Sequence, residues 1–238
     1  RKMNETVKFI VIVNPNNPTG NVAKPSTIME VLSIAKDWPN CTIIADEIYD
    51  ALDFSGDQRS VASLSDEVPV VTLNGVSKVH FAPGWRIGYM AFFDPKRTLQ
   101  APRDGAERIL RSRLCASTPA QYGYLAGLNH DRLWLKERLR TIERRVDLCM
   151  NRIEGIEGLS CNKPGGAFYL FPKIDNPSKY GSDKKFVLDL LHEEHVLVVH
   201  GSGFSPRYGS GHFRLVALAP EDLLNEAFDR IDRFVRSR

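Results

Sequence analysis

The sequence lacks the features that would place the chain in a membrane, a disulfide-rich secreted domain or a nucleic-acid complex. No apolar run approaches the roughly 18 residues of a transmembrane helix, and no signal peptide is visible. Only four of the 238 residues are cysteine, and no two have the spacing of a metal site or a redox pair. The 32 basic residues nearly balance the 29 acidic ones, and a net charge of +3 supplies no basic stripe for nucleic acid. We therefore expect a cytoplasmic protein that binds neither nucleic acid nor membrane.

The composition is that of a folded globular protein. Hydrophobic residues make up 42% and charged residues 26% of the chain. The length suits one large domain or two small ones. Because the chain starts with Arg1 and reaches an apolar strand within a few residues, we expect it to be cut from a longer protein.

Short apolar runs alternate with helical patterns in the first part of the chain. The runs at 9–13, 42–45, 70–73 and 88–93 predict strands, and we expect the first to be buried on both faces. Ile28, Leu32 and Ala35 share one face of a helix predicted over 24–38. Such alternation predicts an α/β fold with a mostly parallel sheet flanked by helices.

The remainder of the chain changes character. Helices are predicted over 96–114, 120–129 and 133–153, followed by short strands at 167–171, 196–199 and 213–216 between helices at 183–195 and 220–236. This pattern predicts a large domain over 1–147 and a smaller C-terminal α+β domain over 148–238.

Polar side chains stand next to the ends of the predicted strands, where ligands bind in open α/β sheets. They are Asn17, Asp46, Tyr49, Ser77, Lys78 and Arg86. Each has a plain structural alternative: the segment 14–20 could be only a turn, Asp46 a helix cap, and Lys78 a lysine that reaches solvent. Together they supply an amine nucleophile, a carboxylate, hydrogen-bond donors and an anion site. A purely structural interpretation would require every one of these residues to lack a function at the same time.

The order and spacing of these motifs carry a resemblance to a known family. Asn-Pro-Asn-Asn-Pro-Thr-Gly at 14–20, Asp-Glu-Ile-Tyr at 46–49, Ser-Lys at 77–78 and Gly-Trp-Arg-Ile-Gly-Tyr at 84–89 resemble the fold-type-I pyridoxal-phosphate aminotransferases. The resemblance covers almost the whole chain from about residue 7. The segments 113–121 and 164–175 look most similar to the alanine aminotransferases of bacteria and archaea.

The resemblance implies a role for each matching residue with pyridoxal 5'-phosphate as the cofactor. Lys78 would form the internal aldimine and later carry the proton, and Asp46 would pair with the pyridinium nitrogen. Tyr49 and Asn17 would hydrogen-bond the ring's phenolic oxygen, and Ser77 and Arg86 would bind the phosphate. Arg214 would bind the substrate α-carboxylate, with Asn17 also near the substrate.

The implied activity is amino transfer from an amino acid to a 2-oxo acid, preferably alanine with 2-oxoglutarate, by a homodimer. Two alternatives stay open: a C–S lyase or decarboxylase that uses the same cofactor, and an aminotransferase-like effector domain of a transcription regulator. By this resemblance, the family's N-terminal part, which carries the substrate-contacting arm, the phosphate loop and the ring-stacking aromatic, would precede Arg1. The isolated chain is therefore expected to be inactive as an enzyme.

Two further motifs carry no cofactor chemistry by themselves. The Gly-Ser-Gly segments at 201–203 and 209–211 lack the strand, helix and lysine of a phosphate loop, and we expect a mobile loop before Arg214. The histidines show no metal-ligand spacing, so no metal is expected.

Overall fold

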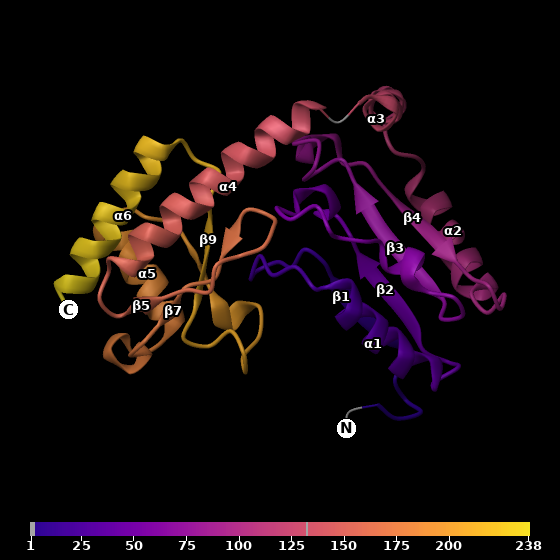
Figure 1. Ribbon diagram of the computed structural model, residues 1–238, viewed down its shortest axis with the longest axis horizontal. Coiled ribbons are helices and arrows are strands. Elements are labelled where there is room, and N and C mark those ends of the chain that lie inside the picture. The colour runs from indigo at the N-terminus through magenta and orange to yellow at the C-terminus, as the bar shows by residue number, and fades with distance from the viewer. Residues whose placement is uncertain (1–2, 132) are drawn as a thin grey trace. The chain divides into compact units, whose positions relative to one another are not determined.

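The computed structural model describes residues 3–131 and 133–238 (Figure 1). The chain forms two compact units. Unit 1 comprises Arg1–Pro15 and Val22–Leu133, and unit 2 comprises Asn16–Asn21 and Trp134–Arg238. The two units divide between Leu133 and Trp134, at the first turn of a long helix. The domain boundary expected at residue 147 lies further along the same helix and stays a prediction.

A four-stranded sheet forms the centre of unit 1. Its strands are β1 (Phe9–Val13), β2 (Thr42–Asp46), β3 (Val70–Gly75) and β4 (Gly88–Phe93), in the order β1-β2-β3-β4. The first three run parallel, and β4 pairs antiparallel with β3. The α/β class and the mostly parallel sheet predicted from the sequence are confirmed.

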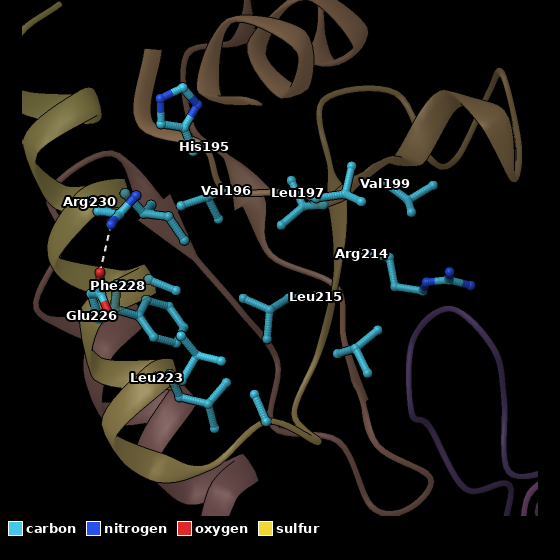
Figure 2. Close-up of a pocket in the computed structure, with 16 residues that line it drawn as sticks. His195, Val196, Leu197, Val199, Arg214, Leu215, Leu223, Glu226, Phe228 and Arg230 are labelled. Carbon is cyan, nitrogen blue, oxygen red and sulfur yellow. Dashed lines mark hydrogen bonds and ion pairs between the residues drawn. The ribbon is translucent and has the colours of Figure 1, made fainter. Parts of the chain in front are cut away.

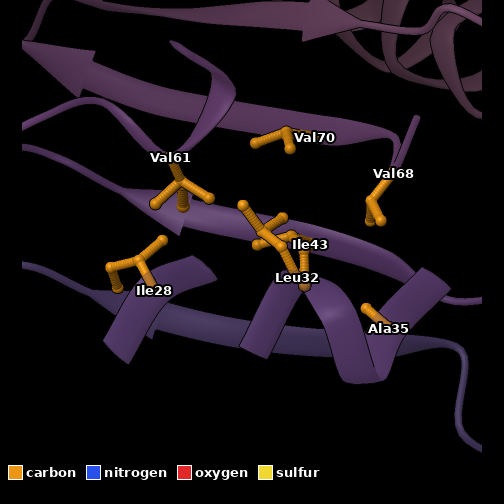
Figure 3. Packing of buried hydrophobic residues seen from close by; sticks show 8 residues of the cluster. Ile28, Leu32, Ala35, Ile43, Val61, Val68 and Val70 are labelled. Carbon is orange, nitrogen blue, oxygen red and sulfur yellow. The ribbon is translucent and has the colours of Figure 1, made fainter. Parts of the chain in front are cut away.

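Helix α1 (Pro25–Lys36) covers one face of this sheet. Proline fits its first turn because the missing backbone N–H would have no partner there. Ile28, Leu32 and Ala35 are buried against Ile43 and Val70 of the sheet (Figure 3). The helical spacing in the sequence thus identified the buried face correctly.

Strand β1 differs from its expected burial. Phe9 and Val11 are 57% and 64% exposed, whereas Ile10 and Ile12 pack against the core below α1. The expectation of burial on both faces was wrong for the described residues, because β1 is an edge strand and α1 covers only one of its faces. An uninterrupted apolar run does not tell how many faces are covered.

The rest of unit 1 consists of short 3-10 turns and two helices. The turns are η1 (Asp50–Leu52), η2 (Val61–Leu64) and η3 (Pro83–Trp85), and the helices are α2 (Gln100–Arg113) and α3 (Thr118–Asn129). Helix α2 buries none of its residues, and α3 buries only Tyr124.

Unit 2 combines helices with very short strands. They are α4 (Leu133–Glu154), β5 (Leu159–Ser160), β6 (Tyr169–Leu170), β7 (Lys173–Ile174), η4 (Pro177–Tyr180), α5 (Asp183–Glu194), β8 (Val199–His200), η5 (Gly201–Gly203), β9 (Phe213–Val216) and α6 (Glu221–Arg236). Strands β6 and β8 flank β9. Both are shorter than the predicted strands at 167–171 and 196–199, since β9 has four residues and offers two to each neighbour.

Helices α5 and α6 close the core of unit 2. Phe186 of α5 stacks on Phe213 of β9 at 5.3 Å between ring centroids and meets Phe234 of α6 edge-on, also at 5.3 Å. Each of the three rings is at most 1% exposed. In the part of the chain that the structure describes, no helix is both long and apolar enough to cross a membrane.

Candidate active site

The carboxyl ends of the parallel strands lie side by side at one edge of the unit 1 sheet. Asp46 at the end of β2 is in register with Val13 of β1 and Leu73 of β3. The backbone continues this alignment past the strands, since Asn14 N donates to Asp46 O at 3.2 Å and Glu47 N donates to Leu73 O at 2.9 Å. The polar residues that follow β2 and β3 therefore stand at the same edge of the sheet.

Asp46 offers a half-buried carboxylate at this edge. Its Oδ1 accepts a hydrogen bond from Ile48 N at 3.2 Å, which stabilises the turn after β2. Within residues 3–131 and 133–238, no second hydrogen bond to this carboxylate is present. The interpretation of Asp46 as a local cap thus accounts for one oxygen and leaves the other for a ligand.

Lys78 and Tyr49 lie together next to the same edge. The chain turns after β2 through a hydrogen bond from Asp50 N to Glu47 O at 2.9 Å, and the Tyr49 side chain is 3% exposed. The Nζ atom of Lys78 is 5.9 Å from the centroid of the Tyr49 ring, within the range of a cation–π contact. The half-buried amine, three residues beyond β3, thus faces the phenol from the turn after β2.

Glu47 shapes this turn, although the sequence analysis did not single it out. Its Oε1 accepts hydrogen bonds from Val61 N at 2.8 Å and from the Ser60 hydroxyl at 3.0 Å. The side chain is buried, and burial raises the pKa of the Glu47 carboxyl above its usual value despite both hydrogen bonds. Glu47 therefore joins the turn that carries Tyr49 to the start of η2.

Ser77 and Arg86 lie at the two ends of the loop between β3 and β4. Gly75 pairs with Gly88, and Val76 N donates to Ile87 O at 3.3 Å, so the loop begins and ends at the same edge. The Arg86 backbone has φ of 53°, which is uncommon for a residue other than glycine. Its exposed guanidinium donates from Nη1 to Pro83 O at 2.8 Å. No hydrogen bond joins Arg86 to Ser77 in the described part of the chain.

Asn17 and Arg214 belong to unit 2 and contact each other there. Arg214 Nη1 donates to Asn17 Oδ1 at 2.9 Å, across 197 residues of sequence. Arg214, Leu215 and Phe228 are among the residues that line a pocket of about 470 Å³. Figure 2 shows the Arg214 side chain directed away from those of Leu215 and Phe228. The segment Asn16–Asn21 is held in unit 2 by Gly165 N and Gly166 N, which donate to Gly20 O at 2.9 Å and 3.0 Å.

Two aromatic residues at Arg214 were missed from the sequence. The Arg214 Cζ atom lies 4.9 Å from the ring centroid of Tyr169 and 4.8 Å from that of Phe204. Tyr169 stands in the segment 164–175 that the sequence analysis quoted, and Phe204 directly follows the Gly-Ser-Gly segment at 201–203. Neither was given a role, because stacking on an arginine leaves no local pattern in the sequence.

A comparison with known proteins identifies the family. The sequence pattern of "Aminotransferase class I and II" matches residues 1–231. The chain belongs to the class I and II aminotransferases. Glutamate-pyruvate aminotransferase AlaA of Haemophilus influenzae is 39% identical over 98% of this chain and 58% of its own length. Aspartate aminotransferase of Bacillus subtilis is 37% identical over 97% of this chain and 58% of its own.

Solved aminotransferases have the same fold. Alanine aminotransferase from Pyrococcus furiosus matches with a TM-score of 0.94 and 47% identity, over 100% of this chain and 60% of that protein. The chain thus spans about three fifths of the aminotransferases that it matches.

This family implies pyridoxal 5'-phosphate as the cofactor, and the residues at the sheet edge fit that molecule. A lysine amine suits an aldehyde, a carboxylate with an oxygen to spare suits a protonated ring nitrogen, and a phenol suits the ring's phenolic oxygen. A serine hydroxyl and a guanidinium suit a phosphate. Among the described residues, no group of three or more histidine, cysteine, aspartate or glutamate side chains could hold a metal ion.

Proposed function

We propose that the protein containing this chain is a pyridoxal-phosphate-dependent transaminase, which moves an amino group from an amino acid to a 2-oxo acid. The observation that carries the proposal is the position of the Lys78 amine, 5.9 Å from the centroid of the Tyr49 ring, at the sheet edge where Asp46 also lies. A lysine amine can act as a nucleophile towards an aldehyde, and Lys78 is half-buried at this edge.

Each residue at the sheet edge has a defined task in this proposal. Lys78 holds the cofactor covalently through Nζ, and its freed amine moves a proton at the substrate Cα as a general base. Asp46 keeps the ring nitrogen protonated, and Tyr49 donates to the ring's phenolic oxygen. Ser77 and Arg86 bind the phosphate. When bound, the cofactor supplies an electron sink for the carbon that loses its proton.

Arg214 and Asn17 complete the proposal from unit 2. The Arg214 guanidinium binds the substrate α-carboxylate, and two of its five N–H donors can meet the two carboxylate oxygens in parallel. Asn17, which accepts a hydrogen bond from Nη1 at 2.9 Å, orients that guanidinium. The amide N–H₂ of Asn17 is then available to the cofactor or the substrate.

We propose alanine with 2-oxoglutarate as the substrate pair. The names of two relatives, glutamate-pyruvate aminotransferase and alanine aminotransferase, support this choice, while another relative is called an aspartate aminotransferase. Transfer from L-alanine and from L-aspartate to 2-oxoglutarate should be compared. We expect kcat/KM to be higher for alanine, and a higher value for aspartate would overturn the pair while leaving transamination intact.

A homodimer in the cytoplasm is also part of the proposal. Light scattering on the protein containing this chain should give twice the mass of one copy. A monomer that binds the cofactor and transfers amino groups would contradict this part alone.

The decisive experiment is Lys78→Ala in the protein loaded with pyridoxal phosphate. We expect the visible absorbance of the amine-bound cofactor to disappear and amino transfer to fall by at least about 1,000-fold, because both the attachment point and the general base are lost. Lys96→Ala is the matched control, since Lys96 is an exposed lysine of unit 1 that pairs with Glu67. An unchanged absorbance and turnover in Lys78→Ala would refute the proposal.

A further inference from the structure

Two aromatic rings lie against the Arg214 guanidinium. Tyr169 lies 4.9 Å and Phe204 4.8 Å from its Cζ atom, and we call these two residues the aromatic bracket. The Nε atom of Arg214 is buried and has no hydrogen-bond partner in the described ranges. Among the described residues, the guanidinium is therefore held by the two rings and by the Asn17 amide, and the rings restrict its rotation.

The two rings of the bracket are held in different ways. Tyr169 belongs to β6, where it pairs with Val216 of β9, and its side chain is 4% exposed. Phe204 is 38% exposed and lies outside the strands, at the end of η5. The position of Tyr169 is thus set by the sheet that also carries Arg214, whereas the position of Phe204 depends on the loop 201–211.

This loop is closed onto itself by backbone hydrogen bonds. Gly201 N donates to His212 O at 2.8 Å, and Gly209 N donates to Ser205 O, also at 2.8 Å. A side chain at Gly201 would collide with the backbone of Gly209 and His212, so glycine is needed at this approach. Backbone hydrogen bonds therefore link the two ends of this loop, while its mobility stays a prediction.

A buried carboxylate fastens the loop to helix α5. Ser202 N donates to Asp183 Oδ2 at 2.6 Å, and Asp183 is 4% exposed. This distance is short for an N–H···O hydrogen bond, and the contact attaches the loop two residues from Phe204. The neighbouring Gly203 N donates to His200 Nδ1 at 3.1 Å, which fixes the same turn from the end of β8.

We propose that Asp183 is a positioning residue for carboxylate binding: it anchors Ser202 and thereby holds Phe204 against the guanidinium of Arg214. The inference rests on the proposed role of Arg214 as the residue that binds the substrate α-carboxylate. Because contacts with two rings already restrict the guanidinium, it loses less conformational entropy when it binds a planar carboxylate. Loss of the attachment weakens substrate binding and leaves the proton transfer at Lys78 unchanged.

The first test compares Asp183→Ala with Ser182→Ala in the enzyme loaded with pyridoxal phosphate. Ser182 is the N-cap of α5, where its Oγ accepts from Lys185 N at 3.1 Å, so its loss weakens the same helix start without touching the loop. For Asp183→Ala we expect KM for both substrates to rise about 5- to 10-fold, which corresponds to the loss of one cation–π contact. We expect kcat to stay within about twofold. Asp183→Asn, which keeps an acceptor oxygen, should recover part of the affinity. An equal rise of KM in Ser182→Ala, or an equal fall of kcat in Asp183→Ala, overturns the inference.

A second test compares Phe204→Leu with Tyr208→Leu. Tyr208 lies in the same loop and also stacks on an arginine, with Arg207 Cζ 5.1 Å from its ring centroid, but it is 65% exposed and away from Arg214. We expect Phe204→Leu to raise KM as Asp183→Ala does and Tyr208→Leu to leave it unchanged. Because both variants disrupt one contact, the double variant Asp183→Ala with Phe204→Leu should be no worse than either alone. Full additivity of the two effects overturns the proposal.

A third readout does not require activity. In protein labelled with ¹⁵N-arginine, the Nε–H signal of Arg214 reports the ring currents of the bracket. We expect Asp183→Ala and Phe204→Leu to shift that signal and Tyr208→Leu to leave it in place. If the signal moves as expected but no amino transfer is found, the positioning inference stands and the proposed function fails. If Asp183→Ala leaves the signal unchanged in an active enzyme, the inference fails and the function stands.

Discussion

Helix α2 in unit 1 and helix α6 in unit 2 both combine apolar with charged residues, but they lie in opposite environments. Both carry apolar residues at helical spacing among many charges, yet α2 buries none of its residues. Helix α6, by contrast, buries Leu224, Phe228, Ile231, Phe234 and Val235. Ile109 of α2 is 70% exposed, whereas Phe228 of α6 is 1% exposed. The comparison teaches that helical spacing predicts which residues share a face but not whether the described part of the protein covers that face.

The strongest test of this difference is Phe228→Ala in α6. Removing a fully buried ring leaves a cavity in unit 2, and we expect a loss of about 3–5 kcal/mol in its free energy of unfolding. Unfolding in urea can be followed through Trp134, which belongs to unit 2, after Trp38 and Trp85 of unit 1 are replaced. A loss below about 1 kcal/mol would mean that the core of unit 2 is less tightly packed than α6 indicates.

Gly20→Ala should have the next largest effect. Gly20 has φ of +66°, and an added Cβ would collide with Pro164 and with the backbone of Tyr169 and Gly166. We expect a cost of about 1–3 kcal/mol and a displaced Asn17, with a weaker hydrogen bond to Arg214. Gly158→Ala is the matched control, since Gly158 also belongs to unit 2 and has positive φ, but an added Cβ there would meet only the Val235 side chain, at 3.9 Å. The two variants should differ in the unfolding midpoint reported by Trp134, and equal midpoints would remove the collision as the cause.

Glu47→Gln should have a smaller effect that depends on pH. Burial raises the Glu47 pKa above its ordinary value of 4.5, so the ionised form is less favourable in the folded state. Wild type should therefore lose stability, relative to Glu47→Gln, as pH rises from about 4.5 through the raised pKa. The glutamine keeps an oxygen that can accept from Val61 N. Urea midpoints of both proteins should be measured across this pH range through Trp38 and Trp85. Above about pH 4.5 we expect the wild-type midpoint to fall relative to that of Glu47→Gln, and a constant difference would show that the raised Glu47 pKa does not affect stability.

Ile109→Ala in α2 should have the smallest effect. With 70% of its surface exposed, Ile109 loses little apolar burial on truncation, and we expect a change within about 0.5 kcal/mol. The measurement is the unfolding midpoint reported by Trp38 and Trp85. A loss comparable to that of Phe228→Ala would show that α2 is covered in solution and would end the contrast between the two helices.

The sequence predicted the sheet edge of unit 1 well because its signals are local. Asp46 and Lys78 follow apolar strands directly, and parallel strands place their carboxyl ends at one edge. These are statements about neighbours along the chain or across one strand pair, which spacing can encode. The contact between Tyr49 and Lys78, at 5.9 Å from the ring centroid to Nζ, was not predicted, because it depends on the turn after β2.

The environment of Arg214 could not be predicted in the same way. Its contacts come from Asn17, Tyr169 and Phe204, which lie in three separate segments and meet only when unit 2 is folded. The prediction that β1 is buried on both faces failed for a related reason. The apolar side chains of Phe9 and Val11 do not indicate whether another element covers their face. Long-range packing is invisible to periodicity, which reports only the element that carries a residue.

The hydrogen bond between Asn17 and Arg214 has a consequence for synthesis of the chain. Asn16–Asn21 are made before all of Val22–Leu133 but belong to the unit whose other residues start at Trp134. During translation Asn17 therefore remains without its Arg214 partner until nearly 200 further residues have been made. The unit that holds Arg214 can reach its native form only after the segment that carries this arginine has left the ribosome.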